Sequence, residues 1–193
     1  MTVYLIRHGQ DDDQIRGGWS KSPLTQSGRD EVHQLGQKFK ELQIDHLFTS
    51  DLPRTLETTA ILKEYQPGIS ITIDSRLREM NNGLLAGMPN ETAEKLYPNL
   101  YFRTLDWTGK YPEGESPELF YHRIINVWEA LTNNLDESIC LVTHGGVINI
   151  ILHHINKKSY SNKKSAYKIP TASLTKIELR SGSHETFFCD SHH

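Results

Sequence analysis

Short apolar runs that end abruptly in polar or turn-forming residues recur along the chain and predict buried strands. The clearest of them is Ile139–Thr143, in which four of five residues are apolar. The predicted strands are Val3–Ile6, His46–Thr49, Ile69–Ile73, Ile139–Thr143 and two late edge strands, Ser173–Leu179 and Glu185–Cys189, joined at Ser181-Gly182.

Between these runs, apolar residues recur at the three- and four-residue spacing of amphipathic helices. The first helix carries Val32, Leu35, Phe39 and Leu42 behind a cap at Thr25 or Ser27. The others run from Leu52 to Glu64 behind Ser50-Asp51, from Ser116 through Phe120, Ile124, Val127 and Leu131, and from His144-Gly145-Gly146 to about His153. This alternation predicts a three-layer α/β/α sandwich with a mostly parallel central sheet and an edge antiparallel strand.

The pattern weakens between residues 74 and 115, where Asn, Gly and Pro mark turns around one short helix near Glu91–Leu96. We expect a single domain over residues 1–193 with an irregular insertion here that serves as a lid or substrate wall. Tyr101, Phe102 and Trp107 supply aromatic surface for such a wall.

Composition narrows the partners and the compartment. The chain has 193 residues, 36% of them hydrophobic, and a net charge of −3. Basic residues are scattered among a slight excess of acids, which argues against nucleic acid or an anionic membrane as partner. We expect no signal peptide, because the N-terminal apolar stretch is too short, and no membrane span. Two lone cysteines are typical of a reducing cytoplasm, which is the expected location. The oligomeric state is left open.

Three predicted strands end directly in unusual polar residues. Arg7-His8-Gly9 follows the first strand, Ser50-Asp51-Leu52-Pro53-Arg54 the second, and His144-Gly145-Gly146 the strand at 139–143. Carboxyl ends of parallel strands meet in one crevice, so two histidines and two arginines should converge there. Guanidiniums, a nucleophilic imidazole and backbone N–H groups at a helix start suit a phosphoryl group without a metal or cofactor.

A proton donor for the leaving oxygen is still required. Glu79, in Leu77-Arg78-Glu79 at the start of the irregular region, is the best candidate carboxylate. The other histidines show no metal-ligand spacing, and the Asp11-Asp12-Asp13 run is better explained as a solvated loop than as a cation site.

The segment Arg7-His8-Gly9-Gln10 resembles the phosphohistidine signature of the histidine phosphatase superfamily, which includes the cofactor-dependent phosphoglycerate mutases. The resemblance covers nearly the whole chain. Its other motifs follow in the family's order: Gly18-Trp19 through Pro23-Leu24-Thr25, Ser50 to Arg54, Leu77-Arg78-Glu79, Gly114-Glu115-Ser116 and Thr143-His144-Gly145-Gly146.

The resemblance implies a role for each matching residue. His8 is then the nucleophile, Arg7 and Arg54 bind the phosphoryl group, and His144 completes the pocket. Glu79 protonates the leaving group and later activates water. Gln10 and the Gly145 backbone also line the pocket.

The sequence departs from the family after Gln10. Many members have Ser or Thr next and an Asn a few residues later that contacts phosphate, whereas this chain has Asp11-Asp12-Asp13-Gln14. Three carboxylates beside an anion pocket would repel the ligand unless they turn outward or meet a cationic group of the substrate. Arg16 is the candidate to replace the lost contact.

Three functions are open. Hydrolysis of a small phosphorylated metabolite is favoured, because Tyr97–Gly114 offers mainly Arg103 and Lys110 where the mutases carry extra basic residues for a bisphosphate. A cofactor-dependent phosphoglycerate mutase is the second reading. A non-catalytic phospholigand-binding protein is the third, motivated by the altered loop after Gln10.

Overall fold

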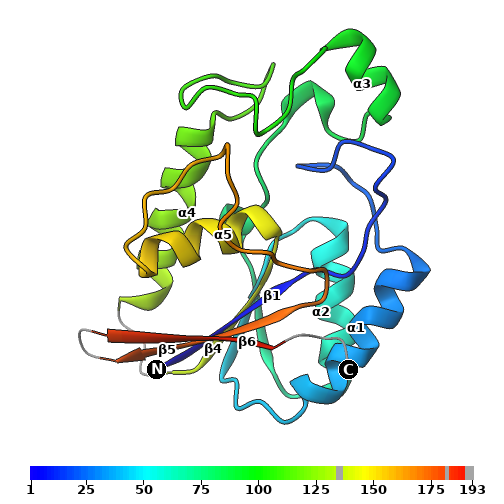
Figure 1. The fold of residues 1–193 in the computed structure, drawn as a ribbon. Coiled ribbons are helices and arrows are strands. Elements are labelled where there is room, and N and C mark those ends of the chain that lie inside the picture. The colour runs from blue at the N-terminus through cyan, green and yellow to red at the C-terminus, as the bar shows by residue number, and fades with distance from the viewer. Residues whose placement is uncertain (134–136, 181–182, 190–193) are drawn as a thin grey trace.

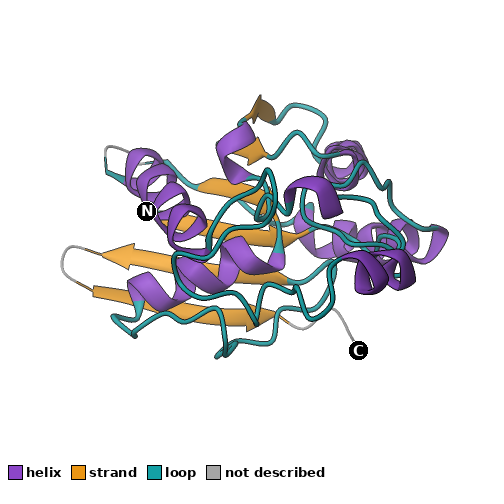
Figure 2. Cartoon of the chain, turned by 90° about the horizontal axis from the view of Figure 1, so that it is seen from above, coloured by secondary structure: helices purple, strands orange, loops and turns teal. Residues whose placement is uncertain are grey.

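The computed structural model describes residues 1–133, 137–180 and 183–189 and shows one six-stranded sheet between two helical layers (Figures 1 and 2). The strand order is β3-β2-β4-β1-β5-β6. The strands are β1 (Thr2–Arg7), β2 (His46–Thr49), β3 (Ser70–Ile73), β4 (Ile139–Thr143), β5 (Leu174–Arg180) and β6 (Ser183–Cys189). The predicted sandwich is confirmed.

Four neighbouring strands run parallel, and the two pairings that follow, of β5 with β1 and of β6 with β5, are antiparallel. β1 and β2 both pair parallel to β4, and β3 pairs parallel to β2. β5 pairs antiparallel to β1, and β6 pairs antiparallel to β5. The predicted antiparallel edge is therefore built from a hairpin of two strands, whose predicted turn at Ser181-Gly182 lies outside the described residues.

The helices follow the predicted order. They are α1 (Gln26–Phe39), α2 (Pro53–Tyr65), α3 (Asn90–Leu96), α4 (Pro117–Thr132) and α5 (Gly145–Ile155), with short 3-10 turns η1 (Ser75–Leu77) and η2 (Gly83–Leu85). Thr25 and Ser116 cap α1 and α4 as predicted, each accepting a backbone hydrogen bond from the first turn.

The predicted cap of α2 is wrong. Leu52 occupies the N-cap position without a side-chain hydrogen bond, and Pro53 opens the helix. Ser50 and Asp51 are engaged elsewhere, Ser50 with His144 and Asp51 with Arg78. Pro53 supplies a preset φ and lacks an N–H that would need a partner, so the helix starts without the side-chain cap.

Alternation along the central strands divides the core into two halves. Val3 and Leu5 of β1 belong to the cluster beneath α4 and α5, whereas Tyr4 and Ile6 belong to the cluster beneath α1 and α2. This period of two is that of a strand buried on both faces. Figure 1 shows the two helix pairs on opposite sides of the sheet.

The irregular segment from 74 to 115 packs on the α4–α5 side of the molecule. Leu77, Met80 and Leu85 are buried in the same cluster as those helices. The short helix predicted at Glu91–Leu96 is confirmed as α3. A function of this segment as lid or substrate wall stays a prediction.

Candidate active site

The carboxyl ends of β1, β2 and β4 meet because β4 lies between the other two in parallel register. His8 follows β1, and its N–H donates to the Thr143 carbonyl at 3.0 Å. Ser50 follows β2, and its N–H donates to the Val142 carbonyl at 3.3 Å. His144 follows β4. These hydrogen bonds between neighbouring strands thus fix the backbone of His8 and Ser50 relative to β4.

His8 is held as a neutral imidazole with one nitrogen free to react. Its Nδ1 lies 2.7 Å from the Gly9 carbonyl oxygen, which can only accept, so the proton resides on Nδ1. Nε2 carries the lone pair and accepts from Arg54 Nε at 3.3 Å. Burial and the cations of Arg54 and Arg7 hold the pKa of His8 well below its usual value, against the Gly9 carbonyl, which raises it.

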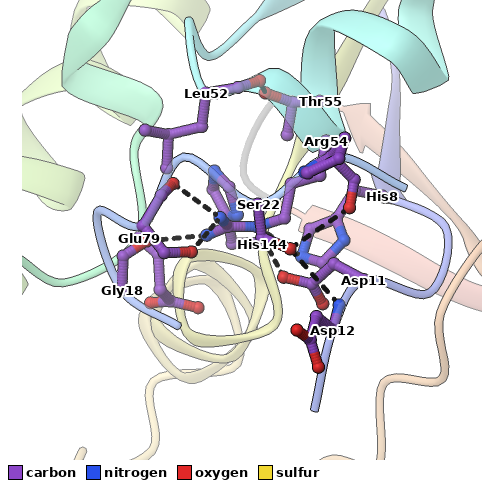
Figure 3. Close-up of polar contacts among 12 residues, drawn as sticks. His8, Asp11, Asp12, Gly18, Ser22, Leu52, Arg54, Thr55, Glu79 and His144 are labelled. Atoms are coloured by element: carbon purple, nitrogen blue, oxygen red, sulfur yellow. Dashed lines mark hydrogen bonds and ion pairs between the residues drawn. The ribbon is translucent and has the colours of Figure 1, made fainter. Parts of the chain in front are cut away.

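Arg54 is the buried cation of the site. Its side chain is 2% exposed, and its guanidinium donates to the Gly18 carbonyl at 2.7 Å and to the carbonyl and hydroxyl of Ser20 at 3.3 Å each. Its Nε also lies 3.5 Å from an Asp11 carboxylate oxygen. Burial lowers the pKa of Arg54 although Asp11 opposes this, and three neighbours fix the plane of the guanidinium against His8 (Figure 3).

The Asp11-Asp12-Asp13 run divides between site and solvent. Asp11 turns inward to Arg54, and burial raises the pKa of its carboxyl more than that cation lowers it. Asp12 and Asp13 are exposed and hydrogen-bond to Gln14. The repulsion anticipated from three carboxylates therefore reduces to one carboxylate that already has a cationic partner.

His144 is completely buried, and its ring packs edge-on beside that of His8. The two ring centroids lie 5.1 Å apart with planes inclined by 60°. His144 Nε2 is 2.8 Å from Ser50 Oγ, which also shares a 2.7 Å hydrogen bond with Thr55. Burial, the Arg54 cation and then His8 hold the pKa of His144 well below its usual value. Its Nδ1 is buried without a hydrogen-bond partner among the described residues.

Glu79 reaches the start of α5, where Gly146 N–H donates to Oε2 at 2.9 Å and Met80 N–H donates to Oε1 at 3.0 Å. The Glu79 carbonyl accepts from Trp19 Nε1 at 2.7 Å and from Arg123 at 3.1 Å. Both the carboxylate and its backbone are therefore fixed. Figure 3 shows His8, Arg54, Glu79 and His144 gathered from four separate segments.

Arg7 joins the end of β1 to a distant loop. Its Nη1 donates to the Ile169 carbonyl at 2.6 Å, and its buried Nε has no hydrogen-bond partner among the described residues. A methyl group on Gly145 would lie 3.5 Å from that Nε, so the first residue of α5 borders the guanidinium. Arg7 and Gly145 both face the same cavity.

Gln10 and Arg16, the two secondary candidates, differ in placement. The Gln10 side chain accepts from Thr25 at 3.1 Å and does not reach the cavity. Arg16 does line it, with its guanidinium 3.9 Å from the Tyr101 ring and 3.5 Å from a Glu94 oxygen. Their roles toward phosphate stay predictions.

The cavity has a volume of about 580 Å³, and His8 and Glu79 lie in its wall. Tyr101 and Phe102 of the irregular segment line it, as the sequence suggests, whereas Trp107 packs behind it against Tyr160. The loop at residues 160–169 also lines the cavity, and no motif in the sequence predicts it there. Its signal is compositional, because five lysines fall between residues 157 and 168 of an otherwise slightly acidic chain.

The described helices contain no stretch that combines the length and apolar character of a membrane span. Among the described residues there is also no cluster of three or more metal-ligating side chains.

Known proteins are similar to this chain in sequence and in fold. The histidine phosphatase superfamily (branch 1) matches residues 3–187. A probable phosphatase of Schizosaccharomyces pombe is 32% identical over 100% of this chain and 95% of its own length. A probable phosphoglycerate mutase of Escherichia coli is 36% identical over 75% of this chain and 70% of its own. The solved structure of Bacillus stearothermophilus YhfR has a TM-score of 0.85 at 25% identity, covering 97% of this chain and 95% of that one.

Proposed function

Because the chain belongs to the histidine phosphatase superfamily and is a phosphatase of that kind, we propose that it hydrolyses a small phosphomonoester through a covalent phosphohistidine at His8. The observation that carries the proposal is the 2.7 Å contact between His8 Nδ1 and the Gly9 carbonyl oxygen, which can only accept a hydrogen bond. With its proton bound toward the Gly9 carbonyl, Nε2 offers a lone pair beside Arg54 in the cavity that also holds Glu79.

In the first step His8 Nε2 attacks phosphorus, and the bond from phosphorus to the ester oxygen breaks. Arg7 and Arg54 spread their charge over the phosphoryl oxygens, for which Arg54 exchanges its contact with Nε2 for one with the anion. Glu79, as the general acid, gives a proton to the departing oxygen. His144 donates a hydrogen bond to the phosphoryl group while Ser50 holds its other nitrogen.

In the second step water attacks the phosphohistidine. Glu79, now a carboxylate, takes the proton from that water as the new bond to phosphorus forms. The nitrogen–phosphorus bond breaks, and neutral His8 and inorganic phosphate are regenerated. Burial of His8 supports this cycle, because it disfavours the imidazolium, in which Nε2 would carry a proton and have no lone pair for the attack on phosphorus.

The test is to trap the covalent intermediate. Wild-type protein mixed rapidly with p-nitrophenyl phosphate and quenched in alkali should carry one phosphoryl group on the peptide containing His8, detected by mass spectrometry. His8→Ala should lose this species and reduce kcat/KM by roughly 10⁴-fold or more. His33→Ala is the matched control, because His33 is exposed and contacts only Tyr65 among the described residues.

Hydrolysis without a phosphopeptide at His8 would contradict the covalent route. Absence of both turnover and phosphopeptide would favour a phospholigand-binding protein. Mutase activity is the second candidate, and the Escherichia coli relative is described as a probable phosphoglycerate mutase. A requirement for 2,3-bisphosphoglycerate in the turnover of 3-phosphoglycerate would establish it in place of hydrolysis.

A further inference from the structure

The wall of the cavity is strongly basic although the chain as a whole is acidic. Five Arg and Lys side chains line the cavity against a single carboxylate, that of Glu79. The whole chain, by contrast, carries a net charge of −3. One reacting phosphoryl group is already served by Arg7 and by Arg54 behind it. The remaining positive charge exceeds what that group requires.

Three of the lining cations come from segments other than the strand ends that carry the reacting groups, and they lack a balancing acid. Arg103 comes from the irregular segment, and Lys164 and Lys168 come from the loop at 160–169. In the part of the chain that the structure describes, no ion pair involves any of the three. Like charges gathered in a concave wall repel one another, so the arrangement favours an anion that bridges them.

The two segments that carry these cations are fastened together. Asn162 is buried, and its Nδ2 donates to the Phe102 carbonyl at 2.7 Å and to the Leu105 carbonyl at 2.9 Å, on either side of Arg103. The loop is also bound at its far end, where Arg7 donates to Ile169. The loop at 160–169 is thus hydrogen-bonded both to the segment that carries Arg103 and to Arg7 at the end of β1.

From this wall we infer that the substrate carries a second anionic group, a carboxylate or another phosphate, which Arg103, Lys164 and Lys168 bind. The inference rests on the proposed function and narrows its substrate class to phosphomonoesters with two anionic ends. The volume of about 580 Å³ suits it, because it lies in the range of sites for whole small molecules and exceeds the needs of one phosphate.

Matched competitors test the inference. Each is added to p-nitrophenyl phosphate hydrolysis, and its inhibition constant is measured. 3-Phosphoglycerate and glycerol 3-phosphate differ by one carboxylate, and fructose 1,6-bisphosphate and fructose 6-phosphate differ by one phosphate. We expect the member with the extra anion to bind about tenfold more tightly in at least one pair. The pair with the larger ratio identifies the second group.

Substitutions then test whether Arg103, Lys164 and Lys168 cause the ratio of the two inhibition constants. The double variant Lys164→Gln, Lys168→Gln should bring the two constants of the responsive pair to within about twofold of each other. Arg103→Gln should reduce the ratio in part. Lys163→Gln is the matched control in the same loop, because the Lys163 ammonium pairs with Asp106 at 3.1 Å and does not line the cavity. It should keep the wild-type ratio.

Equal inhibition within both pairs, or a wild-type ratio in the double variant, would overturn the inference while leaving hydrolysis intact. If p-nitrophenyl phosphate is not hydrolysed and no phosphohistidine forms, the proposed function fails instead. Calorimetric titration of the same competitor pairs still measures the ratio in that case. The two failures are therefore distinguishable.

Discussion

Two groups of residues at the site, here called the inner end and the outer end, are built in different ways. At the inner end, His8, Arg54 and His144 are buried side chains that follow strands or begin helices of the central sheet, and each has fixed polar partners. At the outer end, Arg103, Lys164 and Lys168 are exposed side chains on loops. The inner end is rigid because misplacing a buried charge is costly, whereas the outer end depends on how two loops are fastened.

This difference separates reaction from selection. A buried site tolerates few changes, since each polar atom there has lost water and depends on a protein partner. Solvated cations at a rim contribute less each, and salt screens them. We expect changes at the inner end to abolish turnover and changes at the outer end to alter which phosphomonoester is preferred.

The largest contrast should come from removing one arginine at each end. Arg54→Gln should lower kcat/KM for p-nitrophenyl phosphate by about 10³-fold, because it removes transition-state charge stabilisation. It should also lower the free energy of unfolding by about 3 kcal/mol, since the partly buried Asp11 carboxylate and the Gly18 and Ser20 acceptors lose the Arg54 cation. Arg103→Gln should lower kcat/KM for the same substrate by less than about tenfold. Steady-state kinetics and urea unfolding measure both, and comparable losses in kcat/KM would remove the distinction between the ends.

A single methyl group at the inner end should have the next largest effect. A Cβ on Gly146 would lie 2.3 Å from Glu79 Oε1, so Gly146→Ala must displace the carboxylate. Loss of a positioned acid and base predicts a fall in kcat of about 10²-fold. Gly145→Ala adds the same methyl one residue earlier, at an ordinary 3.5 Å from Arg7, and should cost far less. Equal losses would show that Glu79 placement does not limit kcat.

The inner end was predictable from sequence because strands determine it. Apolar runs such as Ile139–Thr143 locate the strands, and parallel pairing forces the residues that follow them to one edge. Glu79 was harder to place, since it depends on a loop held by Arg123 and Trp19 through backbone carbonyls. The spacing of hydrophobic residues along the chain does not predict such contacts.

The outer end could not be predicted by the same means. The link from Asn162 to Phe102 and Leu105 joins residues about 60 positions apart through one amide. The accumulation of lysines between residues 157 and 168 is visible in the sequence, but the presence of Lys164 and Lys168 in one cavity wall with Arg103 follows only from tertiary structure. The prediction that Ser50 helps to cap α2 was wrong for a related reason, because the Ser50 hydroxyl hydrogen-bonds to His144, a residue distant in the sequence.

The buried histidines of the inner end should make stability depend on pH. The pKa values of His8 and His144 are held well below 6.5 in the folded protein, so below pH 6.5 the unfolded chain binds more protons. The free energy of unfolding should therefore fall as pH drops from 6.5, by up to about 1.4 kcal/mol per pH unit for each histidine. Urea unfolding of His8→Gln between pH 7 and pH 5 should show a shallower slope. Exposed His33→Gln should keep the wild-type slope, and a slope unchanged by His8→Gln would show that His8 titrates normally in the folded state.

The smallest effect should appear where the outer end is fastened. Asn162→Ala removes the amide that donates to Phe102 and Leu105, so the free energy of unfolding should fall by about 1 kcal/mol. With the two basic segments no longer joined, the preference for the competitor with the extra anion should fall about threefold although every cation remains. Inhibition constants of the responsive pair measure this. A preference that survives in Asn162→Ala but disappears in the double lysine variant would show that the charges alone select the substrate, and that the rigidity of the outer wall contributes nothing to selection.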